Sequence, residues 1–387
     1  MSSEYLENRV YELLNQHLSH RPFHLRRLAS VCTGMQLART TQLSKVARWI
    51  RKESQQNSRE QFLKRFLMSP YFSQEAAYYP LVTQALRSYK APHWHLILDR
   101  TNLDKHRLDL LMISLAFRKR AIPLGWEVRP FGGTGSDSQI RLLERIRGLI
   151  PANQRVIVHG DTEFGSVPMM QYVRSHAHWN FILAQKKHTY FQTSDESWHY
   201  VGDLAIKPRQ PVYRADLIWT KKHQYKPVNF FAFYAPHQSS STSPKYTLRY
   251  CTTSLPIAHT LRRVGRRRWG TECMFRDYKS SGWHLDQSGL QNPDNTETLL
   301  VLLAINYLWA TSLGRWLCKS GRRAEIDAKK SAILAFFALA LIGLPINILS
   351  VLLSRLTLNF TINPFFTPIF RILLNGGEIG PTDQHRW

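Results

Sequence analysis

The segment from residue 95 to residue 128, HLILDRTNLDKHRLDLLMISLAFRKRAIPLGWEV, contains three apolar runs separated by short polar connections. The runs are His95–Leu98, Leu108–Phe117 and Ile122–Val128. Apolar runs of this length, bounded by polar and turn-forming residues, are typical of β-strands. Because the connections are short, we expect the three strands to form a β-meander.

Strands and helices alternate after this meander. Pro130–Ser138 is rich in glycine and predicts a flexible link, after which a helix is expected over Gln139–Leu149. A strand at Arg155–Val158, a helix at Val167–Arg174 and a strand at Asn180–Ala184 follow. Such alternation predicts an α/β fold in which helices cover a sheet.

The residues before the meander, from Tyr5 to about Tyr89, have the apolar spacing of helices with basic faces. Thr33-Gly34 would suit a turn between two short helices, as in a helix-turn-helix. We expect this region to contact DNA, although basic surface helices also occur in proteins that bind no nucleic acid.

After residue 185 the sequence becomes aromatic and rich in Thr and Pro, which predicts a strand-rich insertion ending in the loop His237–Pro244. A strand at Tyr246–Ser254, a basic helix from about Ile257 to Lys279 and an apolar helix at Glu297–Leu317 follow. The predicted regions are a helical N-terminal DNA-binding region (1–89), the first part of the core (90–185), a β-rich insertion (186–245), the second part of the core (246–320) and a helical C-terminal region (321–387).

The composition of the 387 residues favours a folded protein with a polyanionic partner. Hydrophobic residues make up 43%, which is enough for a packed core. The 52 Lys and Arg exceed the 27 Asp and Glu, so the formal net charge is +25. This excess indicates nucleic acid or an anionic membrane surface as a partner. None of the four cysteines is at metal-ligand or redox spacing from another, which argues against a zinc ribbon or a disulfide framework.

Two features bear on the location of the protein. The first 30 residues lack the apolar core of a signal peptide, so we expect an intracellular protein. Ser331–Ser354 is free of charge and long enough to cross a bilayer, but Gly343, Pro345 and Asn347 would divide it. We therefore favour a buried or interface helical hairpin, with a membrane-associated basic protein as the alternative.

Three carboxylates occupy positions suited to an active site. Asp99 ends the strand HLILD, Asp161 follows the strand in RVIVHGD, and Glu272 is on the predicted basic helix. In open α/β sheets, functional groups gather at the carboxyl ends of strands. Taken singly, each of these residues is better explained as a solvated surface acid, and Asp161 is also easily explained as a turn residue.

The helix that contains Glu272 adds two cations at defined spacings. Arg268 and Lys279 are four and seven residues from Glu272, so on one regular helix the three side chains would lie within about 40° of one another. A carboxylate between two cations suits phosphate chemistry. A salt-bridged helical face is the plain alternative, since Arg268 and Glu272 are an i,i+4 pair.

Three segments together resemble a known family. LILDRTNL (96–103), VHGDTEFGS (158–166) and RRRWGTECMFRDYKSSGWHL (266–285) resemble the three blocks of the DDE transposases. They are similar, more narrowly, to the bacterial insertion-sequence branch whose third block has Tyr, Arg, Glu and Lys at set spacings. Arg268, Glu272 and Lys279 match three of these positions, and Gly265 stands where the family has Tyr.

This resemblance covers most of residues 90–315 and implies an α/β fold. The expected fold is an RNase H-like catalytic core, a mixed sheet flanked by helices, with a strand-rich insertion, a helical N-terminal domain and a helical C-terminal region. The implied activity is metal-dependent cleavage of DNA at insertion-sequence ends, followed by strand transfer into target DNA. Asp99, Asp161 and Glu272 would be the catalytic residues and would bind two Mg²⁺ or Mn²⁺ ions, with Asp99 bridging both.

The resemblance also implies partners. They are double-stranded DNA, as the terminal inverted repeats of the element and as target DNA, and a second copy of the chain in a synaptic homodimer. No membrane is expected, and the location would be the bacterial cytoplasm, at the nucleoid.

Several basic and aromatic residues are candidate DNA ligands. Arg268 and Lys279 would bind phosphates near the scissile bond, and Arg266 and Arg267 would contribute to a patch that contacts the DNA backbone. A solvated basic face is the alternative for this patch. Trp269 would stack on a distorted base, although packing in the core is the more common role of such an aromatic.

Other motifs favour structural roles. His159 is expected to pack or to support a turn, because metal sites of this type use oxygen ligands. Gly132–Gly135 lacks the lysine of a P-loop. Glu163 could be a spare metal ligand, but we expect a surface role. Two alternatives to the transposase remain open. One is an RNase H-like nuclease without strand transfer, and the other is a catalytically degenerate DNA-binding relative, which Gly265 leaves open.

Overall fold

The structure is a computed structural model that describes residues 3–50, 53–87, 89–103, 105, 107–237, 245–280 and 282–319. The predicted helical C-terminal region (321–387) and its charge-free stretch, Ser331–Ser354, lie outside these residues, as does most of the loop predicted at His237–Pro244. Within the described part of the chain, no helix is long and apolar enough to cross a membrane.

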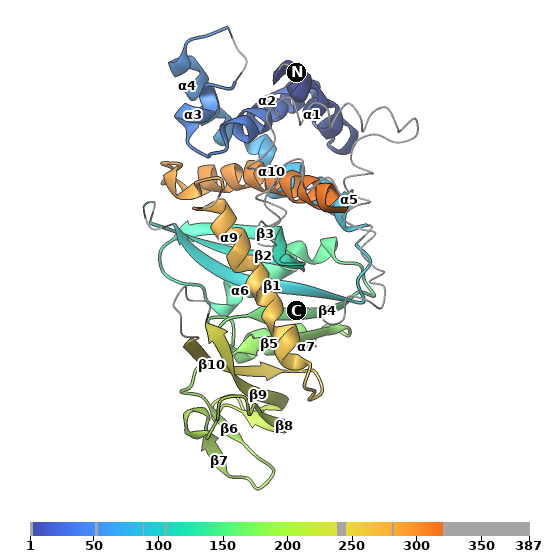
Figure 1. Cartoon of the computed structure of the whole chain (residues 1–387), viewed down its shortest axis with the longest axis vertical. Coiled ribbons are helices and arrows are strands. Elements are labelled where there is room, and N and C mark those ends of the chain that lie inside the picture. The colour runs from blue at the N-terminus through green and yellow to red at the C-terminus, as the bar shows by residue number, and fades with distance from the viewer. Residues whose placement is uncertain are drawn as a thin grey trace.

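A single ten-stranded sheet runs through the described residues, in the order β3-β2-β1-β4-β5-β10-β9-β8-β6-β7 (Figure 1). Its first five strands form the core: β1 (His93–Leu103), β2 (Leu108–Phe117), β3 (Arg120–Pro130), β4 (Arg155–Gly160) and β5 (Trp179–Ala184). The strands β1, β2 and β3 pair antiparallel as the predicted meander, and β4 is parallel to both β1 and β5.

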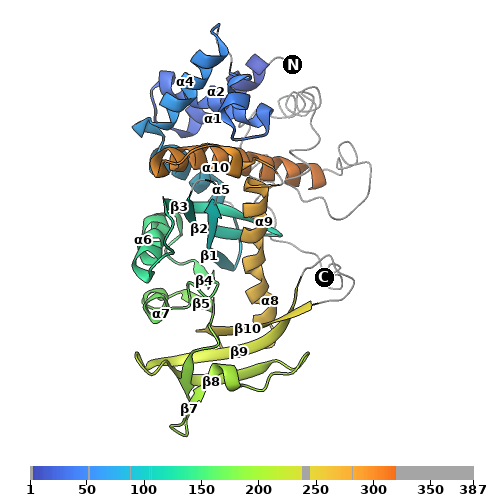
Figure 2. The same ribbon diagram turned by 90° about the vertical axis from the view of Figure 1, so that its left-hand side faces the viewer.

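Helices cover both faces of this sheet. In Figure 2, α6 (Ser136–Ile146) and α7 (Val167–Arg174) lie on one side of the core strands, and α9 (Trp269–Tyr278) lies on the other. All ten residues of β2 are buried, as expected for a strand between two helical layers. The strand order, the directions of the strands and the two helical layers confirm a mixed α/β sheet flanked by helices, consistent with an RNase H-like core.

The strand-rich insertion continues this sheet. It contains β6 (Tyr190–Gln192), β7 (Trp198–Tyr200), β8 (Val212–Trp219), β9 (Tyr225–His237) and β10 (Lys245–Thr253). The last of these strands pairs antiparallel with β5, so the insertion is attached directly to the edge of the core. Backbone hydrogen bonds therefore run from the meander to the end of the insertion.

The N-terminal residues are helical, as predicted, but they contain no turn at Thr33-Gly34. The helices are α1 (Ser3–His17), α2 (Pro22–Ala38), α3 (Leu43–Ala47), α4 (Gln56–Leu67) and α5 (Tyr79–Leu86). Thr33 and Gly34 are buried inside α2. A Cβ at Gly34 would lie only 2.9 Å from Cδ1 of Ile50, so this glycine lets a neighbouring segment approach the helix closely. The helix-turn-helix interpretation of these two residues is wrong.

The predicted helix from Ile257 to Lys279 is also divided. It consists of α8 (Leu261–Gly265), a 3₁₀ turn at Arg266–Arg268 and α9, which ends at Tyr278. Lys279 follows α9 with backbone angles outside the helical region, at φ −87° and ψ −87°. Arg268, Glu272 and Lys279 therefore do not share one regular helix. The predicted apolar helix at 297–317 lies within α10 (Pro293–Lys319).

Candidate functional site

The parallel pairing of β1 and β4 brings the first two acids together. Leu98 pairs with Gly160, so Asp99 and Asp161, the residues that follow them, lie at the same end of two adjacent strands. Asp99 is 5% exposed and accepts a hydrogen bond from the backbone N–H of Arg100 at 3.0 Å. The Asp161 carboxylate accepts the backbone N–H of Glu163 at 2.9 Å. The two acids therefore lie at neighbouring strand ends.

The third acid comes from α9, which packs across β1, β2 and β3. The Thr271 hydroxyl lies 2.7 Å from the Ser114 hydroxyl of β2. At Gly270 the helix backbone lies close to β3, since a Cβ there would be 2.5 Å from the Arg120 carbonyl oxygen. These contacts determine how far the helix backbone at Glu272 lies from the sheet.

Arg268 links the first and third acids. Its Nη1 lies 3.0 Å from Oδ2 of Asp99, and its Nη2 donates to Oε1 of Glu272. The side chains of Asp99, Arg268 and Glu272 are 8%, 20% and 34% exposed, so the shared guanidinium is largely removed from water. The structure thus has two carboxylates converging on one cationic group.

All three acids influence the charge of the buried pair Asp99 and Arg268. Burial raises the pKa of Asp99 to about 7; Arg268 opposes this shift, and the carboxylates of Asp161 and Glu272 add to it. Burial alone would lower the pKa of Arg268, but Asp99, Glu272 and Asp161 outweigh it and the pKa is raised. The three carboxylates therefore favour positive charge at this position, and Arg268 supplies it in this structure.

The acids fit a hard divalent cation, with one condition. Mg²⁺ and Mn²⁺ prefer oxygen ligands, and the converging side chains offer carboxylate oxygens. Among the residues that the structure describes, no three His, Cys, Asp or Glu side chains form a metal-binding group as they stand. Because the Arg268 guanidinium lies between Asp99 and Glu272, binding of metal by both requires Arg268 to release them.

The predicted DNA ligands surround this site in different ways. Lys279 Nζ donates to the Thr101 hydroxyl at 2.8 Å and to the Asn102 carbonyl, so it lies beside β1 and not on the Glu272 face of a helix. Trp269 is 40% exposed, and the interpretation that it packs in the core is wrong. Arg266 and Arg267 are exposed on the 3₁₀ turn next to Arg268.

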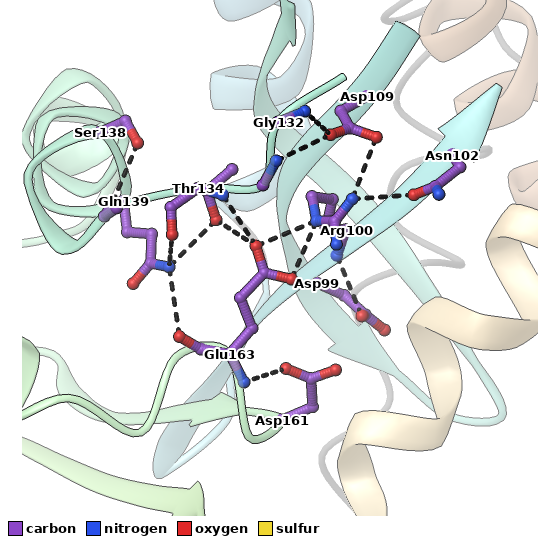
Figure 3. Close-up of polar contacts among 12 residues, drawn as sticks. Asp99, Arg100, Asn102, Asp109, Gly132, Thr134, Ser138, Gln139, Asp161 and Glu163 are labelled. Carbon is purple, nitrogen blue, oxygen red and sulfur yellow. Dashed lines mark hydrogen bonds and ion pairs between the residues drawn. The ribbon is translucent and has the colours of Figure 1, made fainter. Parts of the chain in front are cut away.

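Glu163 is not the surface residue that we expected. Its carboxylate accepts hydrogen bonds from Arg100 and Thr134 (Figure 3). The glycine-rich link is likewise held in place, because the backbone N–H groups of Gly132 and Gly133 donate to Asp109. One signal in the sequence indicates that Glu163 belongs to the site, namely its position two residues after Asp161.

His159 has the packing role that was expected. It is buried in β4, and its Nε2 lies 2.9 Å from Nδ1 of His95 on β1. Burial lowers the pKa of His159 well below its usual range, so the ring stays neutral.

Gly270 allows a sharp test of how α9 is placed. We expect Gly270→Ala to lower the free energy of unfolding by about 1–3 kcal/mol, because the new methyl group would meet backbone and not a movable side chain. Gly265→Ala is the matched control. Its Cβ would meet only Cγ2 of Ile182, at 3.8 Å, and its backbone is helical, so stability should be unchanged or rise by up to about 1 kcal/mol. Urea denaturation measures both, and equal stability of the two variants would contradict this account.

The mixed α/β sheet flanked by helices is consistent with an RNase H-like core, and Asp99 and Asp161 lie at the ends of its adjacent strands β1 and β4. The chain belongs to the Transposase DDE domain family, whose model matches residues 90–309. The matched range includes all three acids, Arg268 and Lys279.

No curated protein matches the sequence. The cryo-EM structure of a piggyBac transposase synaptic complex with hairpin DNA is similar with a TM-score of 0.40 and 10% sequence identity, over 98% of this chain and 84% of that chain.

Proposed function

We propose that this chain is the transposase of a bacterial insertion sequence, of the branch with the Tyr/Arg/Glu/Lys signature, and that it cleaves the element's ends and transfers them into target DNA. The observation that carries the proposal is the convergence of Asp99 and Glu272 on Arg268, within the electrostatic influence of Asp161. A surface salt bridge would not need a third carboxylate or so buried an aspartate.

Asp99, Asp161 and Glu272 would hold two Mg²⁺ or Mn²⁺ ions through their carboxylate oxygens. When bound, such ions stabilise the attacking and leaving oxygens of an in-line displacement at phosphorus. Asp99, the most buried of the three, would lie at the centre of the set. Arg268 would exchange its carboxylate partners for phosphate oxygens, which its planar guanidinium can bind in pairs.

The groups around the acids would hold the DNA. Lys279, next to β1, would donate to a phosphate near the scissile bond, and the exposed Arg266 and Arg267 would contact the backbone farther along. The exposed indole of Trp269 would stack on a displaced base, with a contribution of about 1–3 kcal/mol. The N-terminal helices (1–89) would bind the terminal repeats.

The partners of this activity follow from its substrates. Joining two element ends in one synaptic complex would bring together two copies of the chain as a homodimer. The net charge of +25 suits a protein that holds terminal repeats and target DNA at once. In a bacterium, the site of action would be the nucleoid in the cytoplasm.

The proposal predicts a metal-dependent reaction with two kinds of product. The purified full chain, mixed with DNA that carries the inverted repeats flanking its coding region, should release element ends and join their 3′-hydroxyls to target DNA only when Mg²⁺ or Mn²⁺ is present. Chelation with EDTA should stop both steps. Glu272→Gln should lower both rates by about 100-fold or more, because Gln removes the charge that a hard cation requires.

Glu144→Gln is the matched control for Glu272→Gln. Glu144 also lies on a helix beside an arginine, with 3.7 Å between its Oε2 and Nη1 of Arg147, but the pair is about half exposed on α6. This variant should cleave as the native chain does. Cleavage without joined products would identify a nuclease without strand transfer. Unchanged activity of Glu272→Gln in cells would instead favour a noncatalytic DNA-binding relative.

A further inference from the structure

A polar network connects the ends of β1 and β4 to the glycine-rich loop that begins at Gly132 (Figure 3). Successive side chains of a strand point to opposite faces. Accordingly, Asp99 contacts Arg268 of the helical layer around α9, whereas Arg100 contacts Glu163 and Asp109 on the opposite side. We propose that Glu163 is a positioning residue that fixes the orientation of the Asp161 carboxylate. Its contacts with Arg100 and with the loop at Thr134, which we call the clamp, hold the turn from Asp161 to Phe164 in place. This inference rests on the proposed function.

The Glu163 carboxylate accepts hydrogen bonds from three donors within the chain. The Arg100 Nε–H is shared between Oε1 at 2.9 Å and Oε2 at 2.8 Å. Oε1 also accepts the backbone N–H of Thr134 at 3.0 Å and its hydroxyl at 2.6 Å. A carboxylate engaged in this way has an anchoring geometry and would have to break several charge-assisted bonds to bind a metal ion. Glu163 is therefore assigned to positioning and not to the set of metal ligands.

The clamp reaches Asp161 through the backbone. The N–H of Glu163 donates to Oδ1 of Asp161 at 2.9 Å, so the place of residue 163 decides which way the Asp161 carboxylate faces. Gln139 supports the same turn, because its Nε2 donates to the Glu163 carbonyl at 3.4 Å and to the Thr134 carbonyl at 3.1 Å. Outer contacts of this kind orient metal-binding carboxylates and tune their affinity.

The loop end of the clamp is itself held. Gly132 and Gly133 donate their backbone N–H groups to Oδ2 of Asp109, each at 3.3 Å. The other oxygen of Asp109 forms an ion pair with Arg100 at 3.0 Å. Gly133 has φ +73°, a conformation that favours glycine. Arg100 thus joins two carboxylates that each fix one part of the loop, so the loop, β1 and the Asp161 turn form one connected unit.

The test measures Mn²⁺ binding and DNA cleavage by the full-length Glu163→Gln variant. Gln keeps the size of the side chain but removes the charge that holds Arg100. We expect the Kd for Mn²⁺, measured by calorimetry, to rise by about 10–100-fold, and the Mn²⁺ concentration needed for half-maximal cleavage to rise in parallel. In the metal-free chain, amide hydrogen exchange should quicken at residues 132–135 and 161–165.

Two further variants keep the test decisive. Thr134→Val deletes one donor to Glu163 but keeps the backbone N–H, so the Kd should rise only several-fold, and this variant serves if Glu163→Gln does not fold. Asp137→Asn is the matched control, because Asp137 is an exposed acid near the same loop, in the first turn of α6. It should bind Mn²⁺ as the native chain does.

The possible failures are distinguishable. If Asp99→Asn abolishes Mn²⁺ binding while folded Glu163→Gln and Thr134→Val bind Mn²⁺ and exchange amides as the native chain does, the positioning role is overturned and the proposed function stands. If Asp99→Asn leaves Mn²⁺ binding unchanged, the proposed function fails and this inference fails with it. If Glu163→Gln eliminates cleavage at every Mn²⁺ concentration with an unchanged Kd, Glu163 acts on the DNA directly, and the positioning role is again wrong.

Discussion

Replacing Asp99 by Asn is expected to reduce DNA cleavage and strand transfer by roughly 10³-fold or more, the scale on which loss of one member of a jointly acting catalytic set lowers kcat. Asp99 is the most buried of the three acids and the one whose pKa responds to both of the others. The amide keeps the shape of the side chain but cannot supply the negative charge that a divalent cation requires. Cleavage of labelled element ends at saturating Mg²⁺ measures the loss.

Binding of DNA should separate from chemistry in the same variant. Because Asp99→Asn removes a negative charge beside the phosphate-binding Arg268, its affinity for element ends should be equal to that of the native chain or higher. Filter binding at two salt concentrations measures this. Asp137→Asn, which removes an exposed charge from α6, is the control that should retain cleavage. Full cleavage by both Asp99→Asn and Asp161→Asn would rule out the proposed active site.

Much of the fold follows from local sequence patterns. The predicted strand Leu108–Phe117 and helix Val167–Arg174 have the same bounds in the structure, because each apolar run ends at a clear polar or turn signal. The prediction of one continuous helix over 257–279 is wrong at the segment that contains several closely spaced arginines. Arginines at 262, 263, 266, 267 and 268 repel one another along a helix, and the chain instead makes a 3₁₀ turn at Arg266–Arg268 from which Arg268 reaches Asp99.

Only part of the candidate site could be predicted from the sequence. The strand-end rule and the family blocks together indicated Asp99 and Asp161, and an i,i+4 spacing indicated the pair of Arg268 with Glu272. The clamp at Glu163 could not be predicted, because its partner Thr134 lies on a loop whose position depends on tertiary contacts with Asp109. The exposure of Trp269 could not be decided from the sequence, because aromatic residues are usually buried and core packing competed with the predicted stacking role.

The placement of α9 should depend strongly on one buried ion pair. Arg120, the first residue of β3, has its Nε 2.6 Å from Oδ2 of Asp277, and the Tyr307 hydroxyl of α10 donates to the same oxygen at 3.3 Å. We expect Arg120→Leu to lower the free energy of unfolding at pH 7.5 by about 3–5 kcal/mol, because it leaves a buried carboxylate without its cation. Arg147→Leu, which breaks the half-exposed pair with Glu144, should cost less than about 1 kcal/mol.

The pH dependence of this loss identifies its cause. Burial raises the pKa of Asp277 to about 6, even though Arg120 opposes the shift, so removing Arg120 should raise the pKa further. A carboxyl with a raised pKa keeps its proton to higher pH in the folded chain than in the unfolded chain. The stability that it contributes is present below about pH 4 and is lost as the pH rises through 6. The free energy of unfolding of Arg120→Leu should therefore be closest to that of the native chain near pH 5, where Asp277 is neutral. The difference should grow as the pH rises to 8.

Urea denaturation across this pH range measures the effect, and adding Asp277→Asn to Arg120→Leu should remove most of the pH dependence. A deficit that stays constant from pH 5 to pH 8 would mean that lost packing of the arginine stem, and not the uncompensated charge, destabilises the variant.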